Sequence, residues 1–408
     1  MAHWCSQTVE TLSASLTNSQ SQLSLLATAG VSLSVGLLLR TLLSDQPAEG
    51  EVYHSPLAAV RSAPSNKEHP LPLDALPGGR NVQTPYGSIR VYEWGPEDGP
   101  KVLLIHGITT PCISLGGLAH ALVDQGCRVM LFDLFGRGYS DCPPDLPQDD
   151  RLFSTQIFMA LGSSPISWTG AGSGKFCLVG YSLGGGIAAA FASFFPQLLS
   201  ALILLAPAGL IRDSHISFST RLLYKGGLPT QLLKFLSGRR LRAGPLSAPK
   251  TPQTSKKLHA SNVAAEELPS AAGAEAQKLS RSYPQVTVPK AVQWQVNEHS
   301  GFVHAFVSSM RHGPILAQRQ RAAWERLGVY LSEQQKLSPE QQESKRLTRD
   351  KVVIMCGKTD PIIIHHELLD DATAALGSGI VFKYFSAGHE FPSTKYEEVS
   401  QIIFETLS

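Results

Sequence analysis

Short apolar runs alternate with longer segments of helical spacing along most of the chain. The runs are rich in branched side chains, which is typical of strands in a mainly parallel sheet. They comprise Ser88–Trp94, Lys101–Ile105, Cys127–Phe132, Phe176–Val179, Ala201–Leu205, Lys351–Met355 and Ile380–Phe385, and the helical segments are Leu115–Gln125, Leu183–Phe195 and Thr394–Leu407. Strands and helices in alternation predict an α/β fold built on an open sheet.

An insertion at residues 212–349 interrupts this alternation. The parts that form the predicted sheet are residues 86–211 and 350–408, and we expect them to fold together as one core. Residues 297–311 and 317–331 of the insertion show helical spacing of apolar positions, so we predict that the insertion is partly helical.

Another part of the insertion, residues 238–290, is rich in Ala, Ser, Pro and Lys. This composition predicts a disordered stretch. Its beginning, residues 238–259, carries six basic residues and no acidic residue. Two interpretations fit this charge: a solvated loop, or a basic patch that contacts anionic lipid.

Residues 1–44 form a separate N-terminal segment. It includes an uncharged apolar run, Leu23–Leu39, whose 17 residues reach the lower limit for crossing a bilayer. No Lys or Arg precedes Arg40, which argues against a cleaved signal peptide and against an Arg-rich mitochondrial presequence. We therefore predict a single-pass membrane helix over residues 23–39, with a soluble packing helix or a weak signal peptide as the alternative.

The residues after this run suggest how the chain is arranged around it. Arg40 follows the run directly, and the excess of basic residues on cytoplasmic sides of membranes then places the rest of the chain in the cytosol. The organelle cannot be read from the sequence. Residues 45–85 are rich in Pro, Ser and charged residues, so we predict a linker that leads to the folded core.

Composition narrows the possible classes of function. The chain has 408 residues, of which 43% are hydrophobic and 17% are charged, so disorder throughout and a polytopic membrane protein are disfavoured. The formal net charge of +2 provides no basic field for binding nucleic acid. The six cysteines are spread singly without a C-x-x-C pair, so we predict reduced thiols and neither a disulfide framework nor a zinc site.

The most informative motif is Gly180-Tyr181-Ser182-Leu183-Gly184, a G-x-S-x-G that follows an apolar strand and opens an Ala-rich helix. A serine at such a sharp turn projects its hydroxyl, and the glycines two residues away on either side relieve steric conflict. The positive end of the helix dipole then faces any oxyanion that develops beside the serine. This context predicts that Ser182 is a nucleophile.

Two nearby glycine-rich segments resemble nucleotide-binding motifs, but neither fits. Gly170–Lys175 lacks the first glycine of a P-loop, because Thr169 stands there, and it precedes its strand instead of following it. In Gly180–Gly186, Ser182 occupies the place of the second glycine of a dinucleotide fingerprint. No cofactor site is predicted.

An activated serine needs a base, and the base needs an acid that orients it. His389 lies in a loop between the last predicted strand and the terminal helix, where a catalytic histidine is expected. Asp360 follows the preceding predicted strand and is our candidate for the acid, although a helix N-cap is the alternative role. Asp213, beyond the strand that ends at Leu205, is the second candidate for the acid.

The oxyanion hole is expected from two loops. The amide of Ile108, after the strand that ends at Ile105, and the amide of Leu183 would supply one donor each. His106 is more consistent with a structural role in this loop than with catalysis. Asp133 and Ser140 are expected to build a turn beside the pocket.

The segments HGITTP, FDLFGRGYSD, GYSLGG, GKTDP and AGHEF, in this order, resemble the α/β-hydrolase superfamily. More narrowly, they are similar to its carboxylesterases, monoacylglycerol lipases and carbon–carbon bond hydrolases. The resemblance covers about residues 85–215 and 350–408. It implies an eight-stranded, mostly parallel sheet flanked by helices, with a catalytic triad of Ser182, Asp360 and His389. It also implies that the insertion is a helical cap over the site.

Together these features predict a serine hydrolase that cleaves carboxylic esters through an acyl-enzyme on Ser182. The apolar insertion helices and the predicted anchor favour a hydrophobic or lipid-like ester. An acyltransferase, a thioesterase or a carbon–carbon bond hydrolase would use the same triad, and a non-catalytic membrane-bound binding protein would keep the fold. We expect the substrate and the membrane as partners, and no cofactor, metal or nucleic acid.

Overall fold

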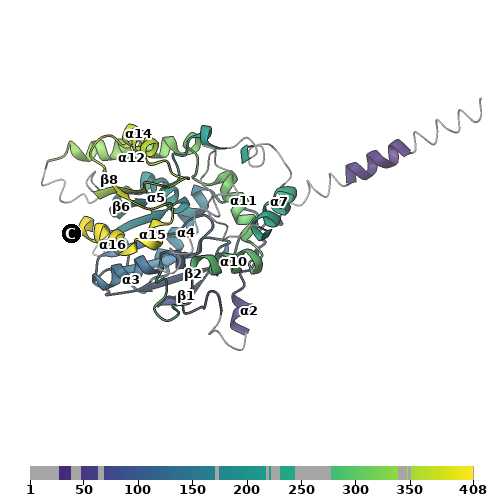
Figure 1. Ribbon diagram of the computed structural model, residues 1–408, viewed down its shortest axis with the longest axis horizontal. Coiled ribbons are helices and arrows are strands. Elements are labelled where there is room, and N and C mark those ends of the chain that lie inside the picture. Colours follow the sequence, from purple (N-terminus) through teal and green to yellow (C-terminus); the bar gives the residue numbers. More distant parts are fainter. Residues whose placement is uncertain are drawn as a thin grey trace, which may run out of the picture.

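One eight-stranded sheet forms the centre of the protein in the computed structural model (Figure 1). Its order is β1-β2-β4-β3-β5-β6-β7-β8; β2 runs antiparallel to both neighbours, and the other pairs are parallel. The strands are β1 (Gly79–Thr84), β2 (Gly87–Trp94), β3 (Lys101–Ile105), β4 (Arg128–Phe132), β5 (Phe176–Tyr181), β6 (Leu199–Leu205), β7 (Val352–Gly357) and β8 (Val381–Phe385). The mostly parallel, eight-stranded sheet predicted above is confirmed. The structure describes residues 27–37, 47–62, 69–170, 174–216, 220–221, 230–243, 277–338, 347 and 351–407.

The central strands coincide with the predicted apolar runs. Every residue of β4, β5 and β7 is buried, as expected where helices cover both faces of a parallel sheet. The five cysteines within the described ranges are also buried and carry free thiols, and Cys5 lies outside those ranges. Local hydrophobic pattern is therefore enough to locate most of this sheet.

The strand that the sequence analysis missed is β1, which lies in the predicted linker 45–85. Its sequence, GRNVQT, is mostly polar because β1 is an edge strand with its residues only partly buried. The same segment contains α2 (Leu57–Ser62), and the backbone of Tyr53 exchanges two hydrogen bonds of 2.9 Å with Cys142. The linker prediction is therefore wrong for these described residues, which pack on the core.

A buried carboxylate fastens β1 to the sheet. The Glu93 side chain of β2 is fully buried, and its Oε2 lies 2.7 Å from Nη2 of Arg80 in β1. Its Oε1 accepts hydrogen bonds from Arg128 of β4, at 3.0 and 3.1 Å, and from Ser164, at 2.8 Å. Burial raises the pKa of Glu93, but the hydrogen bond from Ser164 and the charge of Arg80 outweigh burial and keep this pKa below its ordinary value.

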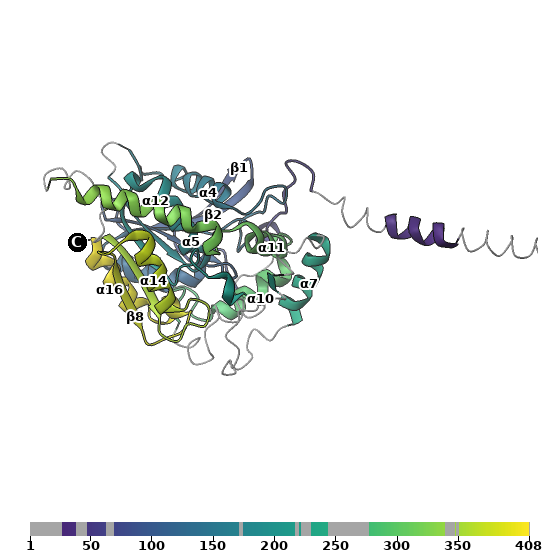
Figure 2. The same ribbon diagram turned by 90° about the horizontal axis from the view of Figure 1, so that it is seen from above.

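Helices cover both faces of the sheet (Figures 1 and 2). On one face α3 packs against α16, and on the other α5 packs on β5 and contacts α4 and α12. These helices are α3 (Gly116–Asp124), α4 (Asp150–Gly162), α5 (Leu183–Phe194), α12 (Ala317–Gln335), α14 (His365–Leu376) and α16 (Tyr396–Leu407), with the short α15 (Phe391–Thr394) before α16. The three helices predicted within the core are confirmed, whereas α4 and α14 were not predicted.

The helix α12 belongs to this outer layer, although the sequence analysis placed residues 317–331 in the cap. Its buried face, which includes Trp324 and Leu327, packs against α5 and α14. A Cβ atom added at Gly328 would lie 2.0 Å from the carbonyl oxygen of Ala375 in α14, so the two helices are in close contact. The cap is therefore shorter than predicted.

Within the described part of the insertion, three further helices lie beside the sheet, and we refer to them as the cap helices. They are α7 (Thr230–Ala243), α10 (Val288–Glu298) and α11 (Phe302–His312). The helix predicted at residues 297–311 begins at Phe302 instead, because α10 ends at Glu298 and a short connection separates the two helices.

The predicted disordered stretch, residues 238–290, is wrong at both ends, and its middle lies outside the described residues. Its start belongs to α7, and its end packs on the core, where Leu279 and Val286 are each 1% exposed. A Cβ atom added at Gly116 would lie 2.1 Å from the carbonyl oxygen of Leu279. These isolated apolar residues reach a core surface that composition alone does not reveal.

The apolar N-terminal run is described only over residues 27–37, which form a helix with exposed side chains. Within the described ranges, no helix has the length and apolar character needed to cross a membrane. The structure therefore gives no support to the membrane anchor predicted over residues 23–39.

We predict that Glu93→Gln lowers the free energy of unfolding by about 3 kcal/mol, because it leaves the buried guanidinium of Arg128 without its charged partner. Urea unfolding would measure this change. The matched control is Glu398→Gln, which removes an exposed carboxylate that pairs with Lys395 at 3.1 Å. The control should change stability by less than about 0.5 kcal/mol. Equal effects of the two substitutions would contradict the anchoring role of Glu93.

Candidate active site

Ser182 sits on a strained turn between β5 and α5. Its φ of 54° and ψ of −117° lie in a region that residues with a Cβ rarely adopt. Four backbone hydrogen bonds hold this conformation. The Ser182 amide donates to Leu205 at 3.0 Å, and its carbonyl accepts from Gly185 and Ala208, both at 2.9 Å, and from Gly186 at 3.2 Å. The strand–turn–helix context expected for Ser182 is therefore present.

Both glycines of the motif are required by close backbone approach. A Cβ atom added at Gly180 would lie 2.2 Å from the carbonyl oxygen of Gly184, and one added at Gly184 would lie 2.3 Å from that of Ile105. The first turn of α5 therefore packs directly on the end of β3. This contact brings Leu183 beside the loop that contains Ile108.

Asp360 and His389 form a buried pair beyond the ends of β7 and β8. Asp360 Oδ2 lies 2.7 Å from His389 Nδ1, and both side chains are fully buried. The other oxygen, Oδ1, accepts hydrogen bonds from the amides of Ile362 (2.8 Å) and Ile363 (2.9 Å). Asp360 therefore orients the imidazole and also holds the turn that follows it, but it is not a helix N-cap, because the N-cap of the next helix, α14, is Ile364. Nδ1 donates to the carboxylate in this arrangement.

The imidazole of His389 also lies next to the serine turn. The ring of Tyr181, the residue before Ser182, has its centroid 5.2 Å from that of His389. The structure thus brings the three predicted residues Ser182, Asp360 and His389 to one place. The alternative acid, Asp213, lies in the short η3 (Asp213–His215), and the acid that contacts His389 is Asp360.

The predicted oxyanion residues, Ile108 and Leu183, line the same pocket as Ser182. The loop that carries Ile108 is held by two polar side chains that sequence reasoning missed. Arg137 Nε donates to the carbonyl of Ile108 at 3.1 Å. Gln295 of α10 donates to the carbonyl of Thr109 and accepts from the amide of Gly138 at 3.0 Å.

Arg137 also connects this loop to the cap. It is fully buried, and its guanidinium donates to Phe135 at 2.9 Å and to the hydroxyl of Ser309 in α11 at 2.8 Å. The sequence signal that could have marked Arg137 is its place in the segment FDLFGRGYSD, which was expected to build a turn beside the pocket. An arginine that is buried in such a place needs several hydrogen-bond acceptors.

His106, Asp133 and Ser140 have structural partners, as the sequence analysis expected. His106 Nε2 accepts from the amide of Leu134 at 2.8 Å, while Nδ1 lies 2.9 Å from the carbonyl of Gly107. Asp133 accepts from the amides of Cys112 and Tyr139, and Ser140 donates to the carbonyl of Asp133. These contacts fix the turns that surround the pocket.

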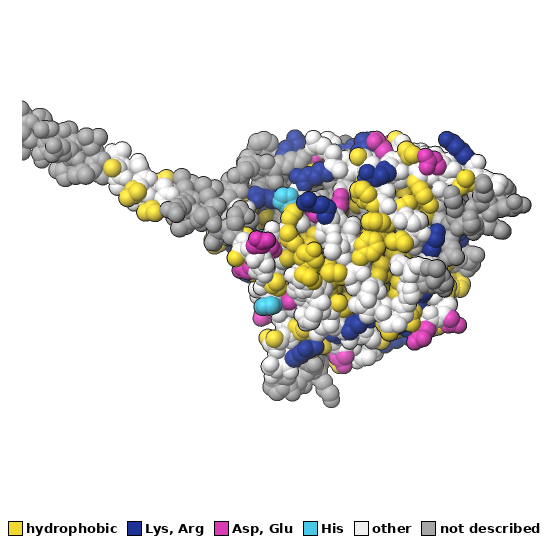
Figure 3. All heavy atoms as spheres, turned by 180° about the vertical axis from the view of Figure 1, so that it is seen from behind, with side chains coloured by type: hydrophobic (Ala, Val, Ile, Leu, Met, Phe, Trp, Pro, Cys, Tyr) yellow, Lys and Arg dark blue, Asp and Glu magenta, His cyan; other side chains and the backbone are white. Residues whose placement is uncertain are grey.

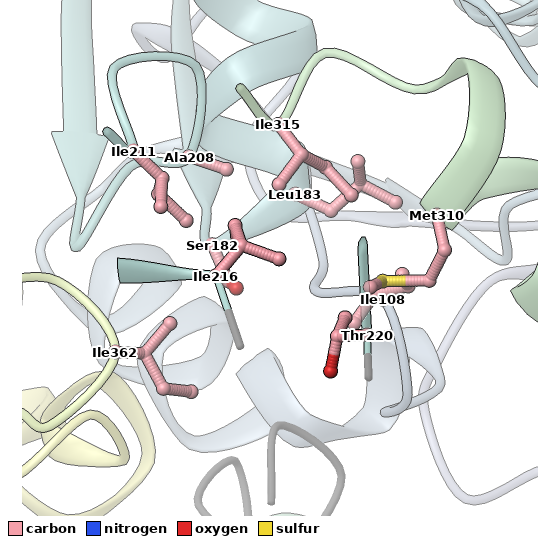
Figure 4. A pocket seen from close by; sticks show the side chains of 10 residues that line it. All are labelled: Ile108, Ser182, Leu183, Ala208, Ile211, Ile216, Thr220, Met310, Ile315 and Ile362. Carbon is pink, nitrogen blue, oxygen red and sulfur yellow. The ribbon is translucent and has the colours of Figure 1, made fainter. Parts of the chain in front are cut away.

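An apolar pocket with a cavity volume of about 40 Å³ lies at Ser182 (Figure 4). Apart from Ser182 and Thr220, its lining side chains are aliphatic or contain a thioether: Ile108, Leu183, Ala208, Ile211, Ile216, Met310, Ile315 and Ile362. They come from the sheet ends, the residues that follow β6 and the cap helix α11. The described part of the lining is suited to a hydrophobic group and offers few polar partners to it.

Comparison with known proteins agrees with this architecture. Residues 100–396 match the model of a family described as alpha/beta hydrolase fold. A solved hydrolase from Pseudomonas aeruginosa PA01 superimposes with a TM-score of 0.52 at 16% identity, covering 81% of this chain and 98% of that one. At this identity the likeness shows the fold alone.

Curated relatives match part of the chain. An uncharacterized protein of Mycobacterium tuberculosis is 32% identical over 161 residues, which are 40% of this chain and 44% of that protein. A mouse protein named serine hydrolase-like protein is 30% identical over 135 residues, which are 33% of this chain and 41% of that protein. The match thus spans less than half the length of these relatives.

The strain at Ser182 predicts a stability difference between two variants that lack the Ser182 hydroxyl. Ser182→Gly removes the Cβ that makes the positive φ unfavourable, whereas Ser182→Ala keeps it. We expect the glycine variant to be more stable than the alanine variant by about 1 kcal/mol, after allowing for the greater freedom of glycine in the unfolded chain. Urea unfolding of both variants would measure this difference. A less stable glycine variant would show that the turn is not strained.

Buried histidines predict that stability falls in mild acid. Burial, with the charge of Arg137 nearby, lowers the pKa of His106 to about 3, and burial lowers those of His299 and His304 to about 4 and about 3. Below pH 6.5 the unfolded chain therefore binds more protons than the folded chain, and the free energy of unfolding decreases as the pH falls towards about 5.

The variant His106→Gln tests this effect, because glutamine can still accept from Leu134 but does not titrate. We expect it to reduce the slope of unfolding free energy against pH by about 1 kcal/mol per pH unit between about pH 6 and 5. Urea unfolding at several pH values would measure the slope. An unchanged slope would mean that His106 binds a proton in the folded state.

Proposed function

Because the chain belongs to the α/β-hydrolase family, we propose that it is a serine hydrolase that cleaves carboxylic esters of hydrophobic or lipid-like acids. The observation that carries the proposal is the position of Ser182. It lies on a strained turn at an apolar pocket, next to a buried Asp360–His389 pair with an Nδ1–Oδ2 distance of 2.7 Å. An exposed structural serine needs none of these features.

In the proposed reaction, Ser182 Oγ attacks the ester carbonyl carbon while His389 Nε2 accepts the hydroxyl proton. The carbonyl oxygen becomes an oxyanion, which accepts hydrogen bonds from the amides of Ile108 and Leu183. When the tetrahedral intermediate collapses, the alcohol leaves with the proton from His389. A water molecule, deprotonated by His389, then attacks the acyl-enzyme, and the acid is released as Ser182 recovers its proton.

The remaining residues have orienting roles in this proposal. Asp360 holds the imidazole with Nδ1 towards the carboxylate, so that Nε2 is the nitrogen left to exchange the proton. Arg137 and Gln295 hold the backbone around Ile108. Preorganised donors matter because the loss of one oxyanion donor costs about 3 kcal/mol of transition-state stabilisation.

The pocket supports a hydrophobic acyl group as the part of the substrate next to Ser182. Among the described residues that line the pocket, which include Met310, Ile315 and Ile362, none is charged. The same site would serve an acyltransferase, a thioesterase or a carbon–carbon bond hydrolase, in which the acceptor or the leaving group differs. A binding protein without activity would keep the pocket but would not need the Asp360–His389 pair.

The test is labelling of the full chain with a fluorophosphonate probe. We expect rapid labelling of the wild type, none in Ser182→Ala, and labelling at least about 100-fold slower in His389→Ala and Asp360→Asn, because both lose proton transfer from the serine. The matched control is Asp213→Asn. His389 Nδ1 pairs with Asp360 and not with Asp213, so this variant should label like the wild type.

Two outcomes would contradict the proposal. No labelling of folded wild type would favour the binding protein, and labelling that persists in Ser182→Ala would place the nucleophile elsewhere. A panel of p-nitrophenyl esters with added alcohol then separates hydrolysis from transfer, since a transferase forms the new ester in preference to the acid.

A further inference from the structure

The cap helix α7 presents an unusual outer surface. Its buried side contains Leu233 and Leu241, which are 0% and 7% exposed. On the opposite side Phe235 is 65% exposed, and Leu232 and Leu236 are 36% and 41% exposed. A helix that is apolar on both sides has a second surface to cover. We call these three exposed side chains, with Arg239 and Arg242, the outer face of α7.

The charge of this helix has one sign. α7 contains Lys234, Arg239, Arg240 and Arg242 and no Asp or Glu. Three of these basic residues, Lys234, Arg239 and Arg242, line an open hollow beside the helix. By contrast, acidic and basic side chains are interspersed around the apolar ones on the face seen in Figure 3. The outer face of α7 therefore combines exposed apolar groups with a local positive charge.

We propose that the outer face of α7 docks on the surface of a lipid bilayer that contains anionic phospholipid. Aromatic and aliphatic side chains of an interfacial helix enter the boundary between headgroups and acyl chains, and its basic side chains interact with phosphate groups. Phe235, Leu232 and Leu236 supply the first kind of contact, and Arg239 and Arg242 the second. Charge complementarity favours this occupant over a neutral apolar partner.

The position of α7 connects this surface to the pocket at Ser182. α7 packs on α11, where a Cβ atom added at Gly238 would lie 3.5 Å from the side chain of Val303. Arg311 of α11 also donates to Thr230 at 3.0 Å, and the residue before it, Met310, lines the pocket. Docking through α7 would therefore bring the cap of the pocket close to lipid.

The N-terminal part of the chain reaches the core near the same place. Pro47 lines a cavity together with Thr230 and Lys234. Before it, the described helix at residues 27–37 exposes apolar side chains such as Val31 and Leu33. The docking proposal stands on α7 and does not depend on the proposed hydrolase activity.

Co-sedimentation of the full chain with vesicles tests the proposal. We expect binding to phosphatidylcholine vesicles with about 30% phosphatidylserine, and weaker binding to pure phosphatidylcholine. Raising the salt from about 0.1 M to about 1 M should release the protein, because the screening length falls from about 10 Å to about 3 Å.

Two variants separate the charge from the apolar contact. Arg239→Gln with Arg242→Gln should weaken binding to anionic vesicles roughly 30-fold, as expected for the loss of two basic residues near the surface. Phe235→Ser with Leu236→Ser should weaken it by about tenfold or more. The matched control is Val329→Ser in α12 with Lys336→Gln at the C-cap of this helix, which lies away from α7 in both ribbon views (Figures 1 and 2). The control should bind like the wild type.

Three results would overturn the proposal. One is unchanged binding of both α7 variants, and another is absence of binding by the wild type. The third is equal, salt-insensitive binding to neutral and anionic vesicles, which would assign membrane contact to the apolar N-terminal helix. Circular dichroism and thermal unfolding show whether each variant is folded, so that lost binding reflects the surface and not the fold.

Discussion

The close packing of the first turn of α5 on the ends of β3 and β5 is the constraint on which the rest of the site depends. It is possible because Gly180 and Gly184 have no side chain. A Cβ atom added at Gly180 would lie 2.2 Å from the carbonyl oxygen of Gly184, and one added at Gly184 would lie 2.3 Å from that of Ile105. The same packing forces Ser182 to a φ of 54° and brings Leu183 next to the loop of Ile108. Three features of one site therefore follow from one backbone contact.

A buried polar network extends this constraint from the sheet to the cap. Arg137 contacts the carbonyl of Ile108 and the hydroxyl of Ser309, and Gln295 contacts the carbonyl of Thr109. These hydrogen bonds are buried, so an incorrect arrangement would leave buried polar groups without hydrogen-bond partners. The cap helices α10 and α11 are thus fixed against the same loop that would bind an oxyanion, and α11 in turn supports α7.

Two surfaces of different character result from this arrangement. Inside the cap, the pocket at Ser182 is almost entirely apolar, so a bound acyl group would gain from burial and not from polar contacts. Outside it, α7 combines Phe235 and its exposed leucines with basic side chains of one sign. A hydrophobic ester is poorly soluble in water, and a hydrolase that meets its substrate at a lipid surface would benefit from both.

The sequence by itself determined the buried strands, the serine turn and the order of Ser182, Asp360 and His389, because these depend on local patterns: apolar runs, a G-x-S-x-G between strand and helix, and polar residues at strand ends. Tertiary structure alone decided which polar residues meet. Arg80 of β1 lies in the segment predicted to be a linker, but it pairs with the buried Glu93. The helix α12 was predicted to lie in the cap, but its apolar face packs on α5. Arg137 donates to Ser309, a residue far along the chain. Local sequence sets how much of a segment is buried, but the partner that satisfies a buried charge is fixed only when distant segments pack together.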